Sequence, residues 1–271
     1  MTEKKERVDV LAVNQGLFET REQAKRGIMA GLVVAAESGE RFDKPGVKIA
    51  DSTELRLKGE KLKYVSRGGL KLEKALAEFG ISVKGKNCLD IGASTGGFTD
   101  VMLQSGAKHV YALDVGTNQL AWKIRSDERV TVMEQFNFRN AVLSDFTEGQ
   151  PEFASIDVSF ISLDLILPPL YQILPEQGQV AALIKPQFEA GRNKVGKNGI
   201  IKDPTVHRQV IEKVLVNSEN IGFSVKNLTF SPIKGGAGNV EFLVHLIKEK
   251  TLQSAAINVA AVVEQEKEQL R

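Results

Sequence analysis

The fold is decided by the stretch Leu89-Asp90-Ile91-Gly92-Ala93-Ser94-Thr95-Gly96-Gly97-Phe98-Thr99-Asp100. Its apolar start predicts a buried strand over 87–91, and the residues after the glycines predict a helix over 97–105. A strand, a glycine-rich turn and a helix start let a ligand lie close to bare backbone. Position 94 is serine and the glycines fall at 92, 96 and 97, so the turn departs from the dinucleotide pattern G-x-G-x-x-G and a diphosphate cradle is disfavoured.

The chain beyond this stretch alternates strands and helices. The further strands are predicted over 109–115, 130–134, 153–160, 178–186, 224–232 and 241–248. The helices are predicted over 67–80, 118–126, 139–145, 163–174 and 205–221, with another in the tail after 251. This order is typical of an α/β fold with a doubly wound, mostly parallel, Rossmann-like sheet. Only the short loop 234–239 joins the last two strands, so they are expected to pair as an antiparallel hairpin at the end of the sheet.

The N-terminal region is predicted to form a second, smaller α/β domain over 1–62, followed by the larger domain over 63–271. Thr20 and Gln23 match a capping box, which predicts a helix start. The spacing of apolar residues on that helix predicts that Ala24, Ile28 and Met29 face inward.

Basic residues are concentrated near the N-terminus. Residues 1–74 hold 16 Lys and Arg against 12 Asp and Glu, whereas the whole chain holds 36 against 34. Arg21, Lys25 and Arg26 lie at one-turn spacing on the side of the second helix that faces away from Ile28. Such a cluster can neutralise several phosphates, which favours a nucleic-acid partner, although a solvated surface explains the same charges.

Composition excludes several classes of protein. The net charge of +2 and the 42% of hydrophobic residues exclude a polycation. Cys88 is the single cysteine and the three histidines are scattered, so neither a disulfide framework nor a metal site is expected. No run approaches the roughly 18–20 apolar residues of a membrane span. The first ten residues are rich in charged side chains and contain no apolar stretch of signal-peptide length. We therefore expect a cytoplasmic protein without a membrane partner, with Cys88 and Trp122 in its core.

The second predicted strand runs into Asp114-Val115, some 20 residues beyond the glycine turn. A carboxylate at this position can accept both hydroxyls of a ribose, or it can cap the following helix. The glycine turn and the acid together favour a cofactor that contains a nucleoside.

Four charged residues are expected to converge beside the glycine turn. Asp157 and Lys185 end the fourth and fifth strands, at the carboxyl edge where open α/β sheets hold ligands. Glu241 begins the antiparallel last strand at the same edge, and Lys71 lies at the rim of the apolar face of helix 67–80, from which Lys74 points away. Each residue taken singly is explained by a structural role, but the four together indicate a catalytic site.

These motifs resemble the S-adenosylmethionine-dependent methyltransferases of the FtsJ-like class, and the resemblance implies S-adenosylmethionine as cofactor. In that class the glycine turn passes the methionine part, the acid after the second strand holds the ribose, and the end of the third strand contacts adenine. This sequence has no aspartate at the adenine position. The cofactor-binding residues implied are Gly92, Ala93, Ser94, Gly96, Gly97, Phe98, Asp114, Val115, Phe136 and Asn137.

The four charged residues look like the catalytic tetrad of ribose 2′-O-methyltransferases. With SRGGLKLEKAL, GASTGGFTD, DVSFISL and LIKPQFE, nearly the whole chain resembles the TlyA family, bacterial ribosomal RNA (cytidine-2′-O)-methyltransferases often labelled hemolysins. Residues 5–60 resemble the S4 RNA-binding domain, which implies binding to ribosomal RNA or ribosomal subunits. The residues expected to bind RNA are Arg7, Arg21, Lys25, Arg26 and Arg67, with Arg192, Lys194 and Lys197 in the basic, glycine-rich loop 187–203.

The chemistry explains these residue types, because a ribose 2′-hydroxyl is a poor nucleophile that needs positioning and a proton acceptor. We expect Lys185 to accept the proton, while Lys71 lowers its pKa and holds the ribose. Asp157 is expected to orient Lys185, and Glu241 to position Lys71 or the ribose. Two alternatives stay open: a membrane-active hemolysin, and an RNA-binding protein with a vestigial methyltransferase fold.

Overall fold

The computed structural model describes residues 5–35, 38–58, 63–191, 195–196, 199–235 and 238–269. The chain forms two compact units, Met1–Lys63 and Tyr64–Arg271, and the second begins one residue after the start expected from the sequence.

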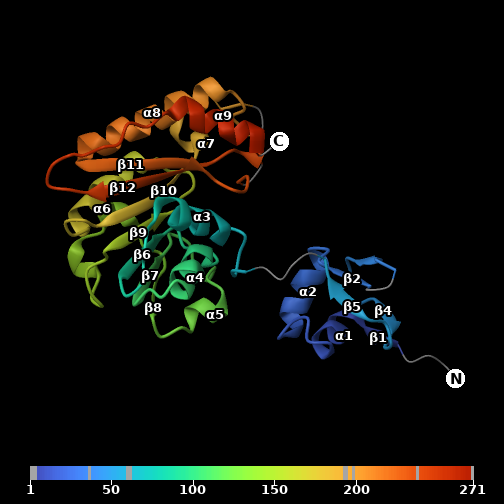
Figure 1. The fold of residues 1–271 in the computed structure, drawn as a ribbon. Helices are drawn as coiled ribbons and strands as arrows, with labels where there is room; N and C mark the ends of the chain where they lie inside the picture. Colours follow the sequence, from blue (N-terminus) through green and yellow to red (C-terminus); the bar gives the residue numbers. More distant parts are fainter. Residues whose placement is uncertain are drawn as a thin grey trace. The chain divides into compact units, whose positions relative to one another are not determined.

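The larger unit is built on a seven-stranded sheet with the order β11-β12-β10-β9-β6-β7-β8 (Figure 1). The five strands from β6 to β10 are parallel, whereas β12 is antiparallel to both of its neighbours. The expected hairpin of the last two strands is therefore confirmed, with β12 inserted between β11 and β10. The strands are β6 (Asn87–Ile91), β7 (His109–Leu113), β8 (Val130–Met133), β9 (Phe153–Ile156), β10 (Gln179–Ile184), β11 (Phe223–Phe230) and β12 (Phe242–Lys248).

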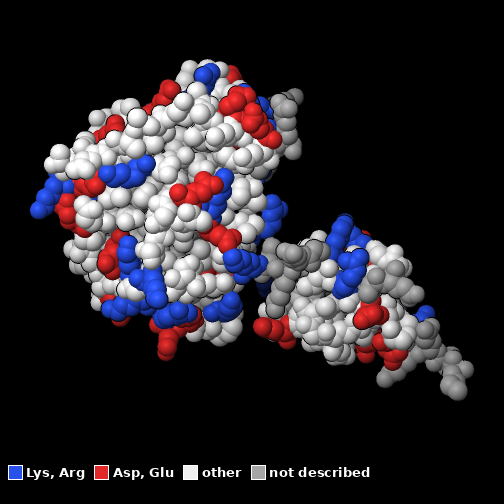
Figure 2. Space-filling view, in the orientation of Figure 1, with Lys and Arg blue, Asp and Glu red and all other residues white. Residues whose placement is uncertain are grey.

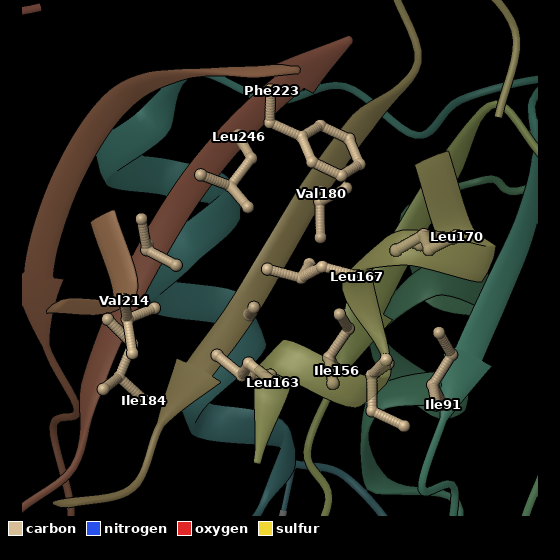
Figure 3. Packing of buried hydrophobic residues seen from close by; sticks show 14 of the residues in the cluster. Ile91, Ile156, Leu163, Leu167, Leu170, Val180, Ile184, Val214, Phe223 and Leu246 are labelled. Atoms are coloured by element: carbon tan, nitrogen blue, oxygen red, sulfur yellow. The ribbon is translucent and has the colours of Figure 1, made fainter. Parts of the chain in front are cut away.

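Helices cover both faces of this sheet, because successive strand residues point to opposite faces and both sets are apolar. Leu89 and Ile91 pack on one side of β6, and Cys88 packs on the other. The Cys88 side is covered by α3 (Gly69–Phe79), α4 (Gly97–Gln104) and α5 (Trp122–Arg125). The opposite side is covered by α6 (Leu167–Ile173), α8 (Pro204–Ile221) and α9 (Val259–Gln269), and Figure 3 shows Leu167 and Leu170 of α6 packed in this core.

The short elements of the larger unit are one-turn helices in the connections. They are α7 (Pro186–Glu189), η1 (Phe138–Asn140), η2 (Leu143–Asp145) and η3 (Leu163–Leu165). The single helix expected over 163–174 is divided into η3 and α6, and two prolines stand in the first turn of α6. Proline is tolerated there because its missing N–H has no partner within the helix.

The smaller unit packs two helices against short strands around its own apolar core. Its second helix begins with the predicted capping box, because the Thr20 hydroxyl accepts from the Gln23 N–H at 3.2 Å and the Gln23 side chain accepts from the Thr20 N–H at 3.2 Å. Ala24 and Ile28 are buried, but Met29 is 60% exposed, so its inward assignment was wrong. The elements are β1 (Lys5–Arg7), α1 (Val8–Asn14), α2 (Arg21–Met29), β2 (Val33–Ala35), β3 (Arg41–Phe42), β4 (Lys48–Ala50) and β5 (Leu55–Leu57).

Cys88 is buried in the core as expected, and burial raises the pKa of its thiol to about 12. Two other side chains of the larger unit, Trp122 and Lys74, lie in environments that differ from the expected ones. Trp122 is 77% exposed rather than in the core, because the helix expected over 118–126 shrinks to the single turn α5. Lys74 does not point away, because its ammonium lies 3.5 Å from the centre of the Phe230 ring. Burial there lowers the pKa of Lys74.

Candidate active site

Two adjoining cavities open at the carboxyl edge of the parallel strands. The Asp114 cavity, of about 350 Å³, is lined by the glycine turn, Asp114, Gln119, Asn137 and the segment 157–161. The lysine cavity, of about 260 Å³, is lined by the other side of the glycine turn and by Lys71, Asp157, Lys185 and Glu241. The two cavities share the turn and Asp157, so a ligand in one lies beside a ligand in the other. A wider hollow of about 610 Å³ lies elsewhere, between α8 and residues 255–260.

The glycine turn needs glycine at position 92 for two reasons. Gly92 has φ of +89°, and a Cβ atom there would lie 2.5 Å from the backbone oxygen of Asp157. A side chain is therefore both strained and obstructed, and without one the backbone of the turn forms the shared wall of the two cavities.

The turn is supported from below by a buried carboxyl group. Asp90 accepts a hydrogen bond from the Thr99 hydroxyl at 2.7 Å and another from the Ser155 hydroxyl at 3.2 Å. Burial raises the pKa of Asp90 to about 7. These bonds tie the end of β6 to α4 and to β9, which fixes the two ends of the turn.

Asp114 is held at the rim of its cavity by backbone groups. One carboxylate oxygen accepts from the N–H of Ser94 at 2.8 Å, and the other accepts from the N–H of Gly116 at 2.8 Å. Because each carboxylate oxygen can accept two hydrogen bonds, both keep capacity for the hydroxyls of a ribose. The same contacts explain why Asp114 does not cap a helix, since α5 begins only at Trp122.

The other residues expected to bind the cofactor are divided between several environments. Gly92, Ser94, Val115 and Asn137 line the Asp114 cavity, and Ala93, Gly97 and Phe98 line the lysine cavity. Gly96 instead packs against Leu120, and Phe136 packs against the core, so the structure does not place these two on a cavity wall. The Asp114 cavity is also lined by residues that no sequence motif singled out for the cofactor, among them Gln119, Phe138, Val158, Ser159, Phe160 and Ile161.

Replacing Asp114 with alanine should weaken the binding of S-adenosylmethionine by about 1.5–3 kcal/mol, the scale of hydrogen bonds to a charged group. Titration calorimetry measures this change directly. Asp127→Ala is the matched control, because Asp127 pairs with Arg129 outside both cavities and should leave cofactor affinity unchanged. Wild-type affinity in a folded Asp114→Ala protein would remove Asp114 from the cofactor site.

The lysine cavity brings four charged side chains together around Asp157. One Asp157 oxygen lies 3.3 Å from the Lys71 ammonium and the other lies 2.5 Å from the Lys185 ammonium. Lys71 also lies 2.6 Å from a Glu241 oxygen, and Lys185 donates to the Ser159 hydroxyl at 3.0 Å. The two lysine side chains are 9% exposed and Glu241 is 3% exposed, so these charges interact with little screening.

The carboxylates and ammonium groups of this cluster stabilise one another's charges. Burial on its own lowers the pKa of Lys71, but Asp157 and Glu241 outweigh burial, so the pKa lies above its usual value. Burial on its own raises the pKa of Asp157, but Lys71 and Lys185 outweigh burial and bring it below its usual value. Lys71 is therefore a fixed positive charge, and Asp157 is a fixed negative charge between two lysines.

Neighbouring groups fix the loops around the cluster. Buried Glu189 accepts from the Ser162 hydroxyl at 2.7 Å and from the Leu163 N–H at 2.8 Å, which ties the segment after Asp157 to α7. Phe160 in that segment has φ of +64° and is 90% exposed, and its ring centre lies 4.9 Å from that of Phe188. Left-handed backbone at a bulky residue is uncommon, so the fold holds this exposed aromatic ring at the cavity against its local preference.

The residues expected to bind RNA belong to both units. In the smaller unit Arg7 and Arg21 each bond the buried Asp9 at 2.9 Å, and Lys25 lies 2.6 Å from Glu22. The hydrogen bond from Arg7 is the main cause that lowers the pKa of Asp9 to about 2. Arg26 is exposed, and Arg67, just before α3, is exposed too. Arg192, Lys194 and Lys197 lie outside the described residues.

The strand order of this sheet, the glycine turn and Asp114 at the carboxyl edge of the strands together define a Rossmann-like methyltransferase. The family model of the FtsJ-like methyltransferases matches residues 64–248. Within that class, the chain belongs to the TlyA/hemolysin A family.

Two curated relatives and one solved structure illustrate the similarity. The "Putative rRNA methyltransferase YqxC" of Bacillus subtilis is 62% identical, covering 91% of this chain and 87% of the relative. The "16S/23S rRNA (cytidine-2'-O)-methyltransferase TlyA" of Mycobacterium tuberculosis is 40% identical, covering 89% of each. The solved "Putative hemolysin from Streptococcus thermophilus" is 64% identical with a TM-score of 0.79, covering 99% of this chain and 98% of that one. Among the described residues, no helix has the length and apolar character to cross a membrane.

Proposed function

We propose that this protein transfers a methyl group from S-adenosylmethionine to the ribose 2′-hydroxyl of a cytidine in ribosomal RNA. The observation that carries the proposal is the position of Asp157, which lies on the wall common to both cavities and pairs with Lys71 and Lys185. A donor in one cavity and a ribose in the other would meet at this wall. The relatives whose names include rRNA methylation support ribosomal RNA as the substrate.

The residues of the Asp114 cavity fit the cofactor. Asp114 offers carboxylate oxygens to a ribose, and Gly92 leaves backbone exposed beside them. Phe138 and Ile166 supply apolar surface for an adenine ring, and Asn137 adds a polar group. When bound, S-adenosylmethionine supplies an electrophilic methyl group on a positively charged sulfur. The Asp157 carboxylate, which stays ionised, would stabilise that positive charge at the junction of the cavities.

The lysine cavity divides the work on the ribose between two lysines. Lys71 contacts two carboxylates that favour its ammonium form, so it is suited to hold the ribose oxygens as a fixed donor. Lys185 contacts one carboxylate and a neutral hydroxyl, so it is the better placed of the two to accept the 2′-hydroxyl proton. Asp157 orients Lys185, and Glu241 orients Lys71. Phe160 and Phe188 offer an aromatic surface on which the base of the target nucleotide could stack.

The smaller unit would bind the RNA through the exposed side of α2. Asp9 bonds both Arg7 and Arg21, which holds their guanidinium groups in place while the rest of each side chain stays partly exposed. Arg26 adds an exposed cation on the same helix. A guanidinium fixed in this way loses less side-chain entropy when it binds a phosphate.

Changing Arg21, Lys25 and Arg26 together to alanine should weaken RNA binding. The slope of the logarithm of the binding constant against the logarithm of the salt concentration should become shallower by about 2. Filter binding at several salt concentrations measures this slope. Cofactor affinity should not change, because the Asp114 cavity lies entirely in the larger unit. The control removes three lysines of the larger unit, Lys213, Lys226 and Lys267. An unchanged slope in the α2 variant would show that this helix does not contact the RNA.

The proposed activity can be tested by incubating the protein with ribosomal subunits and S-adenosylmethionine that carries an isotopically labelled methyl group. After the RNA is digested to nucleosides, label in 2′-O-methylcytidine is expected. Label on a base, or no transfer to either subunit, would contradict the proposal. Liposome leakage measured with the same preparation tests the hemolysin alternative, and no leakage is expected.

A further inference from the structure

The single tryptophan of the chain lies on the surface beside the candidate active site. Trp122 is 77% exposed, which leaves most of a large aromatic side chain in water. It is the first residue of α5, a helix of one turn whose third residue, Ile124, is 1% exposed. The buried Ile124 anchors the turn, so the exposed indole is presented from a fixed backbone.

The backbone around Trp122 is attached to the walls of both cavities. The N–H of Ala121 donates to the carbonyl of Thr95 at 3.1 Å, and Thr95 lines the lysine cavity. Gln119, three residues before Trp122, lines the Asp114 cavity. Because consecutive Cα atoms are 3.8 Å apart, the Cα of Trp122 lies within about 11 Å of the Cα of Gln119. The exposed indole is therefore carried by backbone that is anchored to the walls of both cavities.

The charges around α5 favour an anionic partner. Lys123 and Arg125 are the only charged residues of α5, and Lys123 is 71% exposed. Figure 2 shows Lys and Arg side chains gathered on the part of the larger unit where Figure 1 places α5 and β8. Four acidic groups lie nearby: Asp100 is 3.6 Å from Lys123, Glu134 pairs with Arg125, Asp127 pairs with Arg129, and Glu128 is exposed next to Arg129. Asp100 is 3% exposed, so in the pair next to the indole it is the Lys123 charge that faces solvent.

We propose that Trp122 stacks on an unpaired base of the substrate RNA next to the target nucleotide, with Lys123 on an adjacent phosphate. An exposed aromatic ring next to a cation is the combination that single-stranded RNA requires, because every base has a face that stacks and every linkage carries a charge. The inference rests on the proposed function in taking RNA as the substrate. It adds to the larger unit a contact that is separate from the cationic face of α2.

The intrinsic fluorescence of the full-length protein tests this contact, since all of its tryptophan emission comes from Trp122. In the free protein, acrylamide should quench the emission efficiently. Addition of protein-free ribosomal RNA should shield the indole and change its emission, whereas S-adenosylmethionine alone should not. Trp122→Ala should bind the RNA about 10-fold more weakly, the scale of one base stacked on an aromatic ring. Trp122→Phe should recover most of that loss, because phenylalanine also stacks.

Val216→Ala is the matched control, because Val216 is 54% exposed on α8 and lies on the other face of the sheet. Wild-type RNA affinity in Trp122→Ala, or unchanged acrylamide quenching when RNA is bound, would overturn the inference. Shielding already present in the free protein would show that another part of the chain covers the indole. Shielding by whole ribosomal subunits but not by protein-free RNA would assign the contact to a ribosomal protein. If the wild-type protein binds no RNA at all, the proposed function itself is contradicted. The outcomes above, in which the wild type still binds RNA, contradict only the Trp122 contact.

Discussion

Lys185→Ala should fold, bind S-adenosylmethionine and bind RNA, yet lose methyl transfer by about 100-fold or more, the usual scale for loss of a general base. The alanine cannot accept the 2′-hydroxyl proton, and the ion pairs of Lys71 with Asp157 and Glu241 stay in place, so the cluster loses only the Lys185–Asp157 pair. Single-turnover transfer under saturating cofactor and RNA measures the chemical step without contributions from binding.

Two further variants separate proton transfer from charge. Lys185→Arg should be no more active than the alanine variant, because a guanidinium stays charged and cannot accept a proton. Lys213→Ala is the control, since Lys213 is an exposed lysine on α8 paired with Asp164 and should keep wild-type rates. Substantial activity in Lys185→Arg would mean that position 185 supplies only charge and that another group removes the proton.

Asp157→Ala should have the second large effect, and it should act on stability as well as on transfer. Among the described residues, the hydrogen-bonding or charged partners that remain are the Ser159 hydroxyl for Lys185 and Glu241 for Lys71. Removing one partner of a buried ion pair costs about 3–5 kcal/mol, because the remaining charge stays buried without compensation. Urea unfolding measures this loss. Asp157→Asn should recover part of the stability, since an amide still accepts a hydrogen bond, but little of the transfer activity.

The pH dependence of stability follows from the same carboxylate. The folded-state pKa of Asp157 is below its usual value, so its stabilisation is fully present above the ordinary pKa of 3.8 and is lost as pH falls below that value. As pH falls from 3.8 through the lower folded-state pKa, the wild type and Asp157→Ala should converge in stability. A stability difference that persists undiminished in acid would show that Asp157 acts by packing rather than by charge.

The four charged residues could be brought together from the sequence because topology decides where strand ends meet. Asp157 and Lys185 directly follow the parallel neighbours β9 and β10, and β12 starts at the same edge because it runs antiparallel to β10. Lys71 was expected only at the rim of the apolar face of its helix, whereas its side chain is 9% exposed. The apolar spacing of a helix predicts which face packs, but it does not show that carboxylates from distant strands make burial of an ammonium tolerable.

The cavity walls were less predictable because they are built by irregular backbone. Val158 and Phe160 line the Asp114 cavity, but their apolar character only extended the predicted strand 153–160, which ends at Ile156. Trp122 was placed in the core for the same reason, because an aromatic residue at helical spacing normally packs inward. Only the three-dimensional structure shows that residues 118–121 of the predicted helix are not helical.

The most direct test compares ribose-methylation maps of ribosomal RNA from cells that lack this protein, cells complemented with the wild type, and cells complemented with Lys185→Ala. The wild type should add a 2′-O-methyl group at one or a few cytidines. The Lys185→Ala strain, at equal protein abundance, should match the strain without the protein. Identical maps in all three strains, or a methyl group restored by Lys185→Ala, would contradict the assignment of this site to ribose methylation.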